Sequence, residues 1–93
     1  MGKKEKLFAR IQNNQQNVRF QDFCALIEAF DFALIRTRGS HHLYQRPDVD
    51  AVMNVQPQKD GRAKAYQVRQ FLKLVQTQAL TLDDETEDEA DEQ

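Results

Sequence analysis

Apolar residues recur at helical spacing in three segments of the chain. Four of them between Phe20 and Phe30 follow the i, i+3, i+4, i+7 rule, which predicts a helix with one buried face. The same rule over residues 63–80 predicts a longer helix, and a shorter amphipathic pattern predicts one over residues 3–13. The polar run Asn13–Asn17 favours a loop, because asparagine side chains compete for backbone hydrogen bonds.

Three short segments have the β-branched and aromatic character of strands. They lie between the second and the last predicted helix, at Phe32–Arg38, His41–Arg46 and Ala51–Gln56. Gly39 allows a tight turn between the first two, which predicts a hairpin. Prolines follow the second and third segments, and proline cannot donate a hydrogen bond to a sheet.

The order helix, helix, strand, strand, strand, helix predicts an α+β fold. We expect the helices to pack on one face of a three-stranded antiparallel sheet. A chain of 93 residues has room for one such domain. We assign residues 1–17 to a helical extension with a polar loop, residues 18–80 to the domain, and residues 81–93 to a disordered acidic tail.

The charge is distributed unevenly along the chain. Residues 1–80 hold all 13 Lys and Arg against seven acids, a formal charge of +6, whereas residues 81–93 hold eight acids and no base. The folded part is therefore basic and suits a phosphate-bearing partner. The acidic run is most simply a solubilising tail; the alternative is a nucleic-acid mimic that competes for the basic face.

The composition excludes several other classes of protein. No apolar run approaches the roughly 18 residues that a membrane helix needs, and no signal-peptide stretch follows the Lys-rich start. We therefore expect a cytoplasmic protein with no membrane association. Cys24 is the single cysteine, so no internal disulfide or thiolate metal cage can form, and a small buried hydrophobic role is favoured.

The chain's two histidines, His41 and His42, open the second predicted strand, directly after the Gly39-Ser40 turn. Imidazole is the side chain whose charge changes between pH 5 and 8, so these residues are candidates for proton transfer. Because successive strand residues point to opposite faces, the two rings cannot chelate one ion, and we expect neither a metal nor a cofactor. The alternative is a passive pair, one half-buried and one solvated.

Three stretches stand in an order and spacing that is hard to produce by chance. They are Arg38–Tyr44 with its Gly-Ser-His, then Pro47 and Asn54–Gln56, then Ala63–Leu72 with its Tyr-Gln-Val-Arg-Gln. Together, over about residues 20–74, they resemble the HicA family of toxins from type II toxin–antitoxin systems.

The resemblance implies a fold like a double-stranded RNA-binding domain. It further implies an mRNA interferase, which is a ribosome-independent endoribonuclease silenced by a HicB antitoxin. The Gly-Ser-His histidine, which is the catalytic residue in the family pattern, corresponds to His41, and His42 is the second candidate for this role. Many members carry a second histidine or a basic pair after the third strand, and Lys59 is its substitute here.

On this basis we expect metal-independent cleavage of mRNA, with His41 as general base or acid and the nearby cations stabilising the charge that develops on the phosphate. The alternative is a non-catalytic RNA-binding module or an inactive toxin relative. The expected RNA contacts are Arg36, Arg38, Ser40, Tyr44, Arg46, Lys59 and Lys64. Tyr44 would stack on an unpaired base, although packing within the sheet explains this residue equally well.

Overall fold

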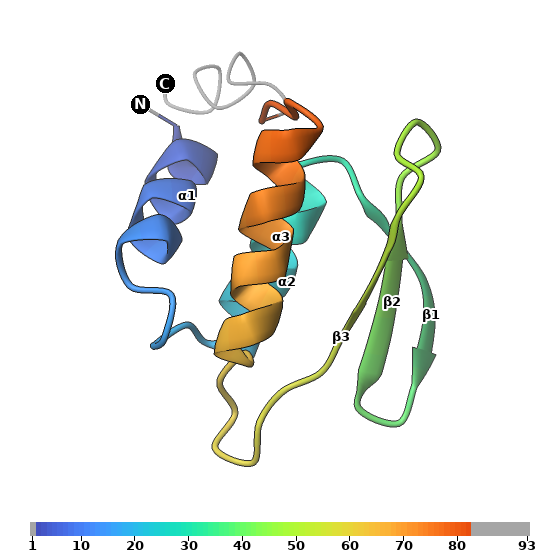
Figure 1. Ribbon diagram of the computed structural model, residues 1–93. Helices are drawn as coiled ribbons and strands as arrows, with labels where there is room; N and C mark the ends of the chain where they lie inside the picture. The colour runs from blue at the N-terminus through green and yellow to red at the C-terminus, as the bar shows by residue number, and fades with distance from the viewer. Residues whose placement is uncertain (1, 83–93) are drawn as a thin grey trace.

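The computed structural model describes residues 2–82, and within them the helices and strands follow the predicted order (Figure 1). The α+β fold class is confirmed, and most element ends lie within one or two residues of the prediction. The last helix is shorter than predicted. The elements are α1 (Lys3–Asn13), α2 (Phe20–Ala29), β1 (Ala33–Arg38), β2 (His41–Gln45), β3 (Val52–Val55) and α3 (Ala65–Thr77).

The sheet is antiparallel with the order β1-β2-β3, so β2 is its central strand. Gly39 turns the chain between β1 and β2 with a φ of +61°, a left-handed conformation that favours glycine. Next to this turn Arg38 pairs with His41. On the other side of β2, His42 pairs with Val55. The two histidines therefore lie at the hairpin end of the sheet.

A bulge interrupts the pairing of β1 with β2. Leu34 lies opposite Tyr44, but the next paired residue on β1 is Arg36, opposite Leu43, and Ile35 has no partner. An extra residue of this kind shifts the alternation of side chains by one position. Leu34 therefore belongs to one face of the sheet and Arg36 to the other.

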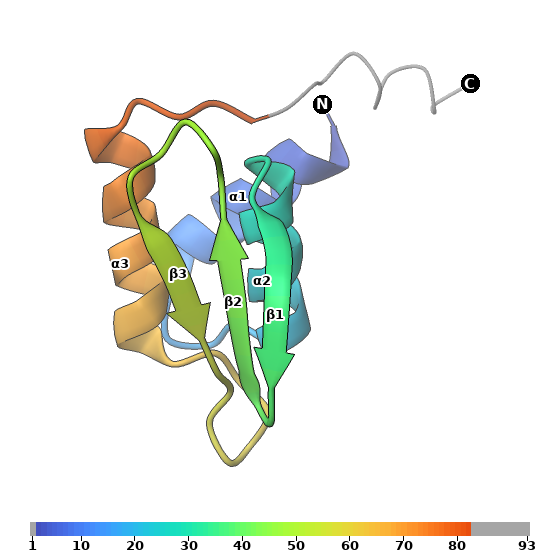
Figure 2. The same cartoon turned by 90° about the vertical axis from the view of Figure 1, so that its right-hand side faces the viewer.

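The helices cover one face of the sheet and leave the other face open (Figures 1 and 2). Tyr44, Met53 and Val55 are buried between the sheet and the helices. Phe71 of α3 lies in the middle of this core, in edge-to-face contact with the rings of Phe23, Phe30 and Phe32 at centroid distances of 6.1, 5.7 and 5.6 Å. Such aromatic pairs contribute beyond the area that they bury.

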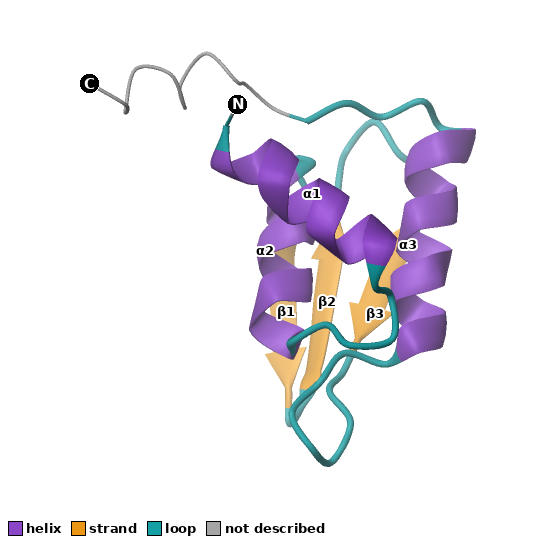
Figure 3. Cartoon of the chain, turned by 90° about the vertical axis from the view of Figure 1, so that its left-hand side faces the viewer, coloured by secondary structure: helices purple, strands orange, loops and turns teal. Residues whose placement is uncertain are grey.

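The N-terminal helix α1 lies across α2 and α3, on the side away from the sheet (Figure 3). Its Ile11 is 2% exposed, and the ring of Phe8 contacts that of Phe30 at 5.2 Å. The segment predicted as an extension therefore contributes side chains to the main core. Every helix within residues 2–82 is too short or too polar to span a lipid bilayer.

At the other end of the chain, Leu80 and Leu82 pack partly buried against the core. The rest of the predicted acidic tail, residues 83–93, lies outside the described residues.

Candidate functional site

His41 lies at the start of β2 on the open face of the sheet, where its side chain is exposed. Its Nδ1 atom is 3.3 Å from Oδ1 of Asn54 on the neighbouring strand β3. An amide oxygen only accepts hydrogen bonds, so Nδ1–H donates and the lone pair of the neutral ring is on Nε2. No described residue forms a hydrogen bond with Nε2. This nitrogen can therefore accept a proton from a bound ligand.

Asn54 is itself held in place by the buried side chain of Gln67 on α3. Nε2 of Gln67 donates to the backbone carbonyl of Asn54 at 3.3 Å, and its Oε1 accepts from the backbone N–H of Gln56 at 3.2 Å. These two bonds tie the end of β3 to α3. Through Asn54 they connect the helix to the ring of His41.

Asn54 and Gln67 were not predicted as site residues from the sequence. A signal for Gln67 was present, since it stands four and eight residues before the buried Phe71 and Val75 of α3. A polar residue on a buried helical stripe needs a hydrogen-bond partner. For Asn54 the signal is the β2–β3 register, which the sequence alone does not give.

His42 points to the opposite face of the sheet, as the strand alternation predicted. Its ring lies edge to face with that of Phe20 on α2 at 5.0 Å, and its Nδ1 donates to the backbone carbonyl of Ser40 at 3.2 Å. The ring contact attaches the hairpin to the start of α2, and the hydrogen bond lies within the hairpin turn. The geometry gives His42 a structural role in the hairpin.

Arg36 and Arg38 lie on the same face as His41, because the bulge moves them away from the face of Leu34. Both are exposed, and neither forms an ion pair with a described residue. Both side chains therefore face solvent on the surface that carries His41.

The other predicted contacts at this end of the sheet come from loops. Ser40 is exposed in the hairpin turn. Lys59 is exposed in the loop after β3, and the half-exposed Lys64 stands directly before α3. Since Val55 pairs with His42, the loop that follows β3 lies beside the hairpin (Figure 2). The structure thus brings these residues to the end of the sheet that carries His41.

Tyr44 does not belong to this surface, which corrects the prediction that it contacts RNA. The residue is 1% exposed, and its hydroxyl donates to Oε2 of Glu28 on α2 at 2.9 Å. Burial raises the pKa of the Tyr44 hydroxyl, and contacts with Cys24 and Glu28 act in the same direction. Burial likewise raises the pKa of the Cys24 thiol. A buried ring cannot stack on a base.

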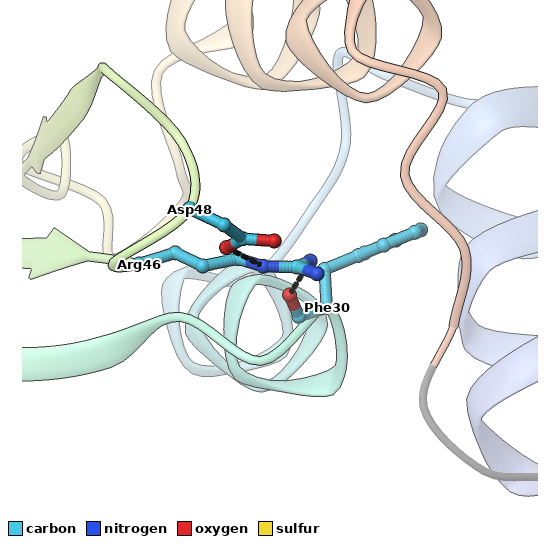
Figure 4. A network of polar contacts seen from close by, with 3 residues as sticks. All are labelled: Phe30, Arg46 and Asp48. Carbon is cyan, nitrogen blue, oxygen red and sulfur yellow. Dashed lines mark hydrogen bonds and ion pairs between the residues drawn. The ribbon is translucent and has the colours of Figure 1, made fainter.

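Arg46 is also not positioned as predicted, because its side chain turns inward at the far end of β2 (Figure 4). A guanidinium nitrogen donates to the backbone carbonyl of Phe30 at 2.7 Å, and Nε donates to Asp48 at 2.7 Å. A cation at a helix C-terminus satisfies a free carbonyl and interacts favourably with the helix dipole. We therefore remove Arg46 from the set of RNA contacts.

Within residues 2–82, no three His, Cys, Asp or Glu side chains gather in a group that could hold a metal ion. His41 and His42 point to opposite faces, as their positions in the strand predicted. The site described above therefore consists of one exposed imidazole, its amide partner and a group of cations.

Comparison with known proteins gives a family for the chain. The family model described as the HicA toxin of bacterial toxin–antitoxin systems matches residues 20–76, from the start of α2 to the last turn of α3. No curated protein and no solved structure matches the chain. The matched segment contains the whole sheet, His41, Asn54 and Gln67, but not α1. The chain belongs to the HicA toxin family, the toxins of toxin–antitoxin pairs.

Proposed function

We propose that this toxin is an endoribonuclease that cleaves mRNA without a metal ion, using His41 for proton transfer. A HicB-type antitoxin is its proposed partner, and the cytoplasm, where mRNA is translated, its proposed location. The observation that carries the proposal is the environment of His41, an exposed imidazole with Nδ1 bonded to Asn54 and with Arg38 on the paired strand.

The proposed reaction is attack of a ribose 2′-oxygen on the adjacent phosphorus. Nε2 of His41 takes the 2′-hydroxyl proton, the 2′-oxygen bonds to phosphorus, and the bond from phosphorus to the 5′-oxygen breaks. The leaving oxygen receives a proton from the imidazolium or from water. The products are a 2′,3′-cyclic phosphate and a 5′-hydroxyl. A well-placed histidine contributes on the order of 10²–10⁴ in rate to such a step.

The cations around His41 supply the electrostatic part of the proposed mechanism. Negative charge grows on the phosphate oxygens in the transition state, and fixed positive charges stabilise it more than the ground state. Arg38 pairs with His41 across the hairpin, and Arg36 lies two residues before it on the same open face. Lys59 and Lys64, together with Ser40 in the turn, would position the flanking RNA.

A cleavage assay tests the proposal. The wild type, incubated with single-stranded RNA and EDTA, should yield fragments with cyclic phosphate ends, and His41→Ala should yield none while keeping its thermal stability. His42→Gln is the matched control, because this ring packs on Phe20 on the other face, and it should retain cleavage. Cleavage by the His41→Ala variant would defeat the assignment. RNA binding without cleavage by the wild type would instead indicate the non-catalytic module.

Growth measurements test the biological part. Expression of the wild type in a bacterial host should arrest growth, and expression of His41→Ala should not. Coexpression of an antitoxin encoded by a neighbouring reading frame should restore growth. Normal growth on expression of the wild type would count against an active interferase.

A further inference from the structure

A second basic surface lies outside the site described above. A cleft of about 430 Å³ opens between the end of α1, the connection to α2 and the loop before α3. The buried side chains of Ile11 and Val18 form its apolar part, at 2% and 4% exposure. The rest of its lining is polar or charged: Arg10, Asn14, Asn17, Arg19, Asp22 and Arg62.

Two of these arginines are held opposite each other by the backbone. Arg19 and Arg62 form an isolated antiparallel bridge, which is flanked by hydrogen bonds from Ala63 N–H to the Val18 carbonyl at 2.7 Å and from Phe20 N–H to the Gly61 carbonyl at 3.1 Å. Directly opposite residues in such a pair share a face, and like charges there are destabilising. An anion that binds near both side chains would offset the repulsion between these two positive charges.

The carboxylates nearby do not neutralise the cleft. Arg19 has no ion pair with any residue from 2 to 82. Arg10 reaches Asp22 at 3.5 Å and Arg62 reaches Asp60 at 3.7 Å, and both pairs are largely solvent-exposed. Exposed pairs of this kind contribute little. Three arginines therefore line the cleft against one carboxylate, that of Asp22.

The cleft is connected to the end of the sheet that carries His41. A neighbouring hollow of about 470 Å³ shares Arg19 and Arg62 with it and is also lined by Phe20 and by the carboxylate of Asp60. The ring of Phe20 contacts that of His42, the residue after His41. In Figure 1 the α1–α2 connection, the loop before α3 and the β1–β2 turn all lie at the lower end of the molecule. The cleft, the neighbouring hollow and the hairpin thus lie at one end of the molecule, and a flexible strand that leaves the cleft passes the hairpin turn to reach His41 on the open face.

We propose that this cleft binds the phosphate backbone of single-stranded RNA at nucleotides flanking the cleavage site. The proposal rests on the proposed function, since it extends the substrate of the same site. Arg10 comes from α1, which lies outside the family-matched segment. The RNA contact made by Arg10 is then specific to chains that carry this helix.

Binding measurements on the uncleaving His41→Ala protein test the cleft without relying on catalysis. The probe is a fluorescent single-stranded RNA oligonucleotide, titrated over a range of salt concentrations. Adding Arg19→Gln and Arg62→Gln should weaken binding and reduce the slope of log affinity against log salt by about 0.7 for each phosphate that the protein no longer neutralises. The matched control, Lys6→Gln with Lys73→Gln, removes the same charge from exposed positions on α1 and α3 outside the cleft.

A third variant changes the affinity in the opposite direction. Asp22→Asn removes the one carboxylate of the cleft and should tighten RNA binding, which a variant that merely destabilises the fold would not do. Equally weakened binding in the arginine pair and the lysine pair would reveal only a net-charge effect and overturn the proposal. An unchanged affinity of the arginine variant for the RNA would also overturn it, and so would a failure of the RNA to bind at all. Absence of cleavage by the wild type would contradict the proposed function and would leave the proposal for the cleft standing, because the binding test does not depend on cleavage.

Discussion

The ring of His41 on β2 donates a hydrogen bond through Nδ1 to the side-chain oxygen of Asn54 on β3. The bond crosses the open face of the sheet and fixes which ring nitrogen carries the proton. In the proposed mechanism this makes Asn54 a positioning residue, because it acts on the substrate only through His41.

Replacing Asn54 by alanine should therefore slow cleavage by roughly tenfold, the effect of losing one hydrogen bond of about 1.4 kcal/mol. Asn54→Asp keeps an acceptor and adds a negative charge, so it should retain the tautomer and move the pH–rate profile to higher pH. Single-turnover cleavage across pH 5–9 measures both effects. Identical profiles for the wild type and both variants would show that the contact does not act on His41.

Gln67→Ala should destabilise the fold by about 2 kcal/mol. The substitution removes two partly buried hydrogen bonds, to the Asn54 carbonyl and from the Gln56 N–H, and each contributes about 1 kcal/mol. The control is Gln70→Ala, an exposed position on the same helix, which should change stability by less than about 0.5 kcal/mol. Urea unfolding compares them. Equal midpoints would mean that the two hydrogen bonds contribute nothing to stability.

Tyr44 makes the fold sensitive to alkaline pH. Its pKa is raised in the folded state, so the neutral phenol stabilises the protein fully below the unfolded-state value of about 10. Above that pH the unfolded chain loses the proton first, and the wild type should lose up to about 1.4 kcal/mol per pH unit through this group.

The measurement is the free energy of unfolding of Tyr44→Phe from pH 7 to 11. At neutral pH this variant should be less stable than the wild type by about 1 kcal/mol, and the difference should shrink as the pH rises above 10. Tyr66→Phe, at a position that is 51% exposed, is the control and should follow the wild type throughout. A difference that stays constant with pH would contradict the prediction.

Arg46 and Arg38 carry the same charge but should respond differently to substitution. Arg46→Gln removes the cation that meets the Phe30 carbonyl and should lower stability by about 1–2 kcal/mol while leaving the salt dependence of RNA binding unchanged. Arg38→Gln should leave stability unchanged and reduce the slope of log affinity against log salt by about 0.7. Thermal unfolding and RNA titration of both variants decide between the two roles. A reduced slope for Arg46→Gln would return it to the RNA-binding set.

The fold was predictable because each element has its own periodicity. The apolar stripes of α2 and α3 and the prolines after the second and third strands depend only on neighbouring residues. The opposite directions of His41 and His42 follow from the same local rule. The catalytic role of His41 came from the family resemblance, and it stays a proposal.

The neighbours of these residues were not predictable, because they depend on register and on helix ends. The bulge at Ile35 breaks the period of two, so the face of Arg36 and Arg38 could not be read from alternation. Arg46 turns inward because the free backbone carbonyl of Phe30, at the C-terminal end of α2, lies within hydrogen-bond distance of its guanidinium group. The pairing of Arg19 with Arg62 joins segments far apart in the chain.

The bulge has a further consequence at the outer edge of the molecule. β1 is an edge strand, and Leu34 and Ile35 on it are 45% and 51% exposed. An exposed apolar edge strand of this kind favours pairing with the edge strand of another copy. A kinked strand offers an incoming chain an uneven row of donors and acceptors, so growth into a polymer is opposed at the first addition. The irregularity that turns two arginines outward thereby also makes β1 a poorer template for a strand of another copy.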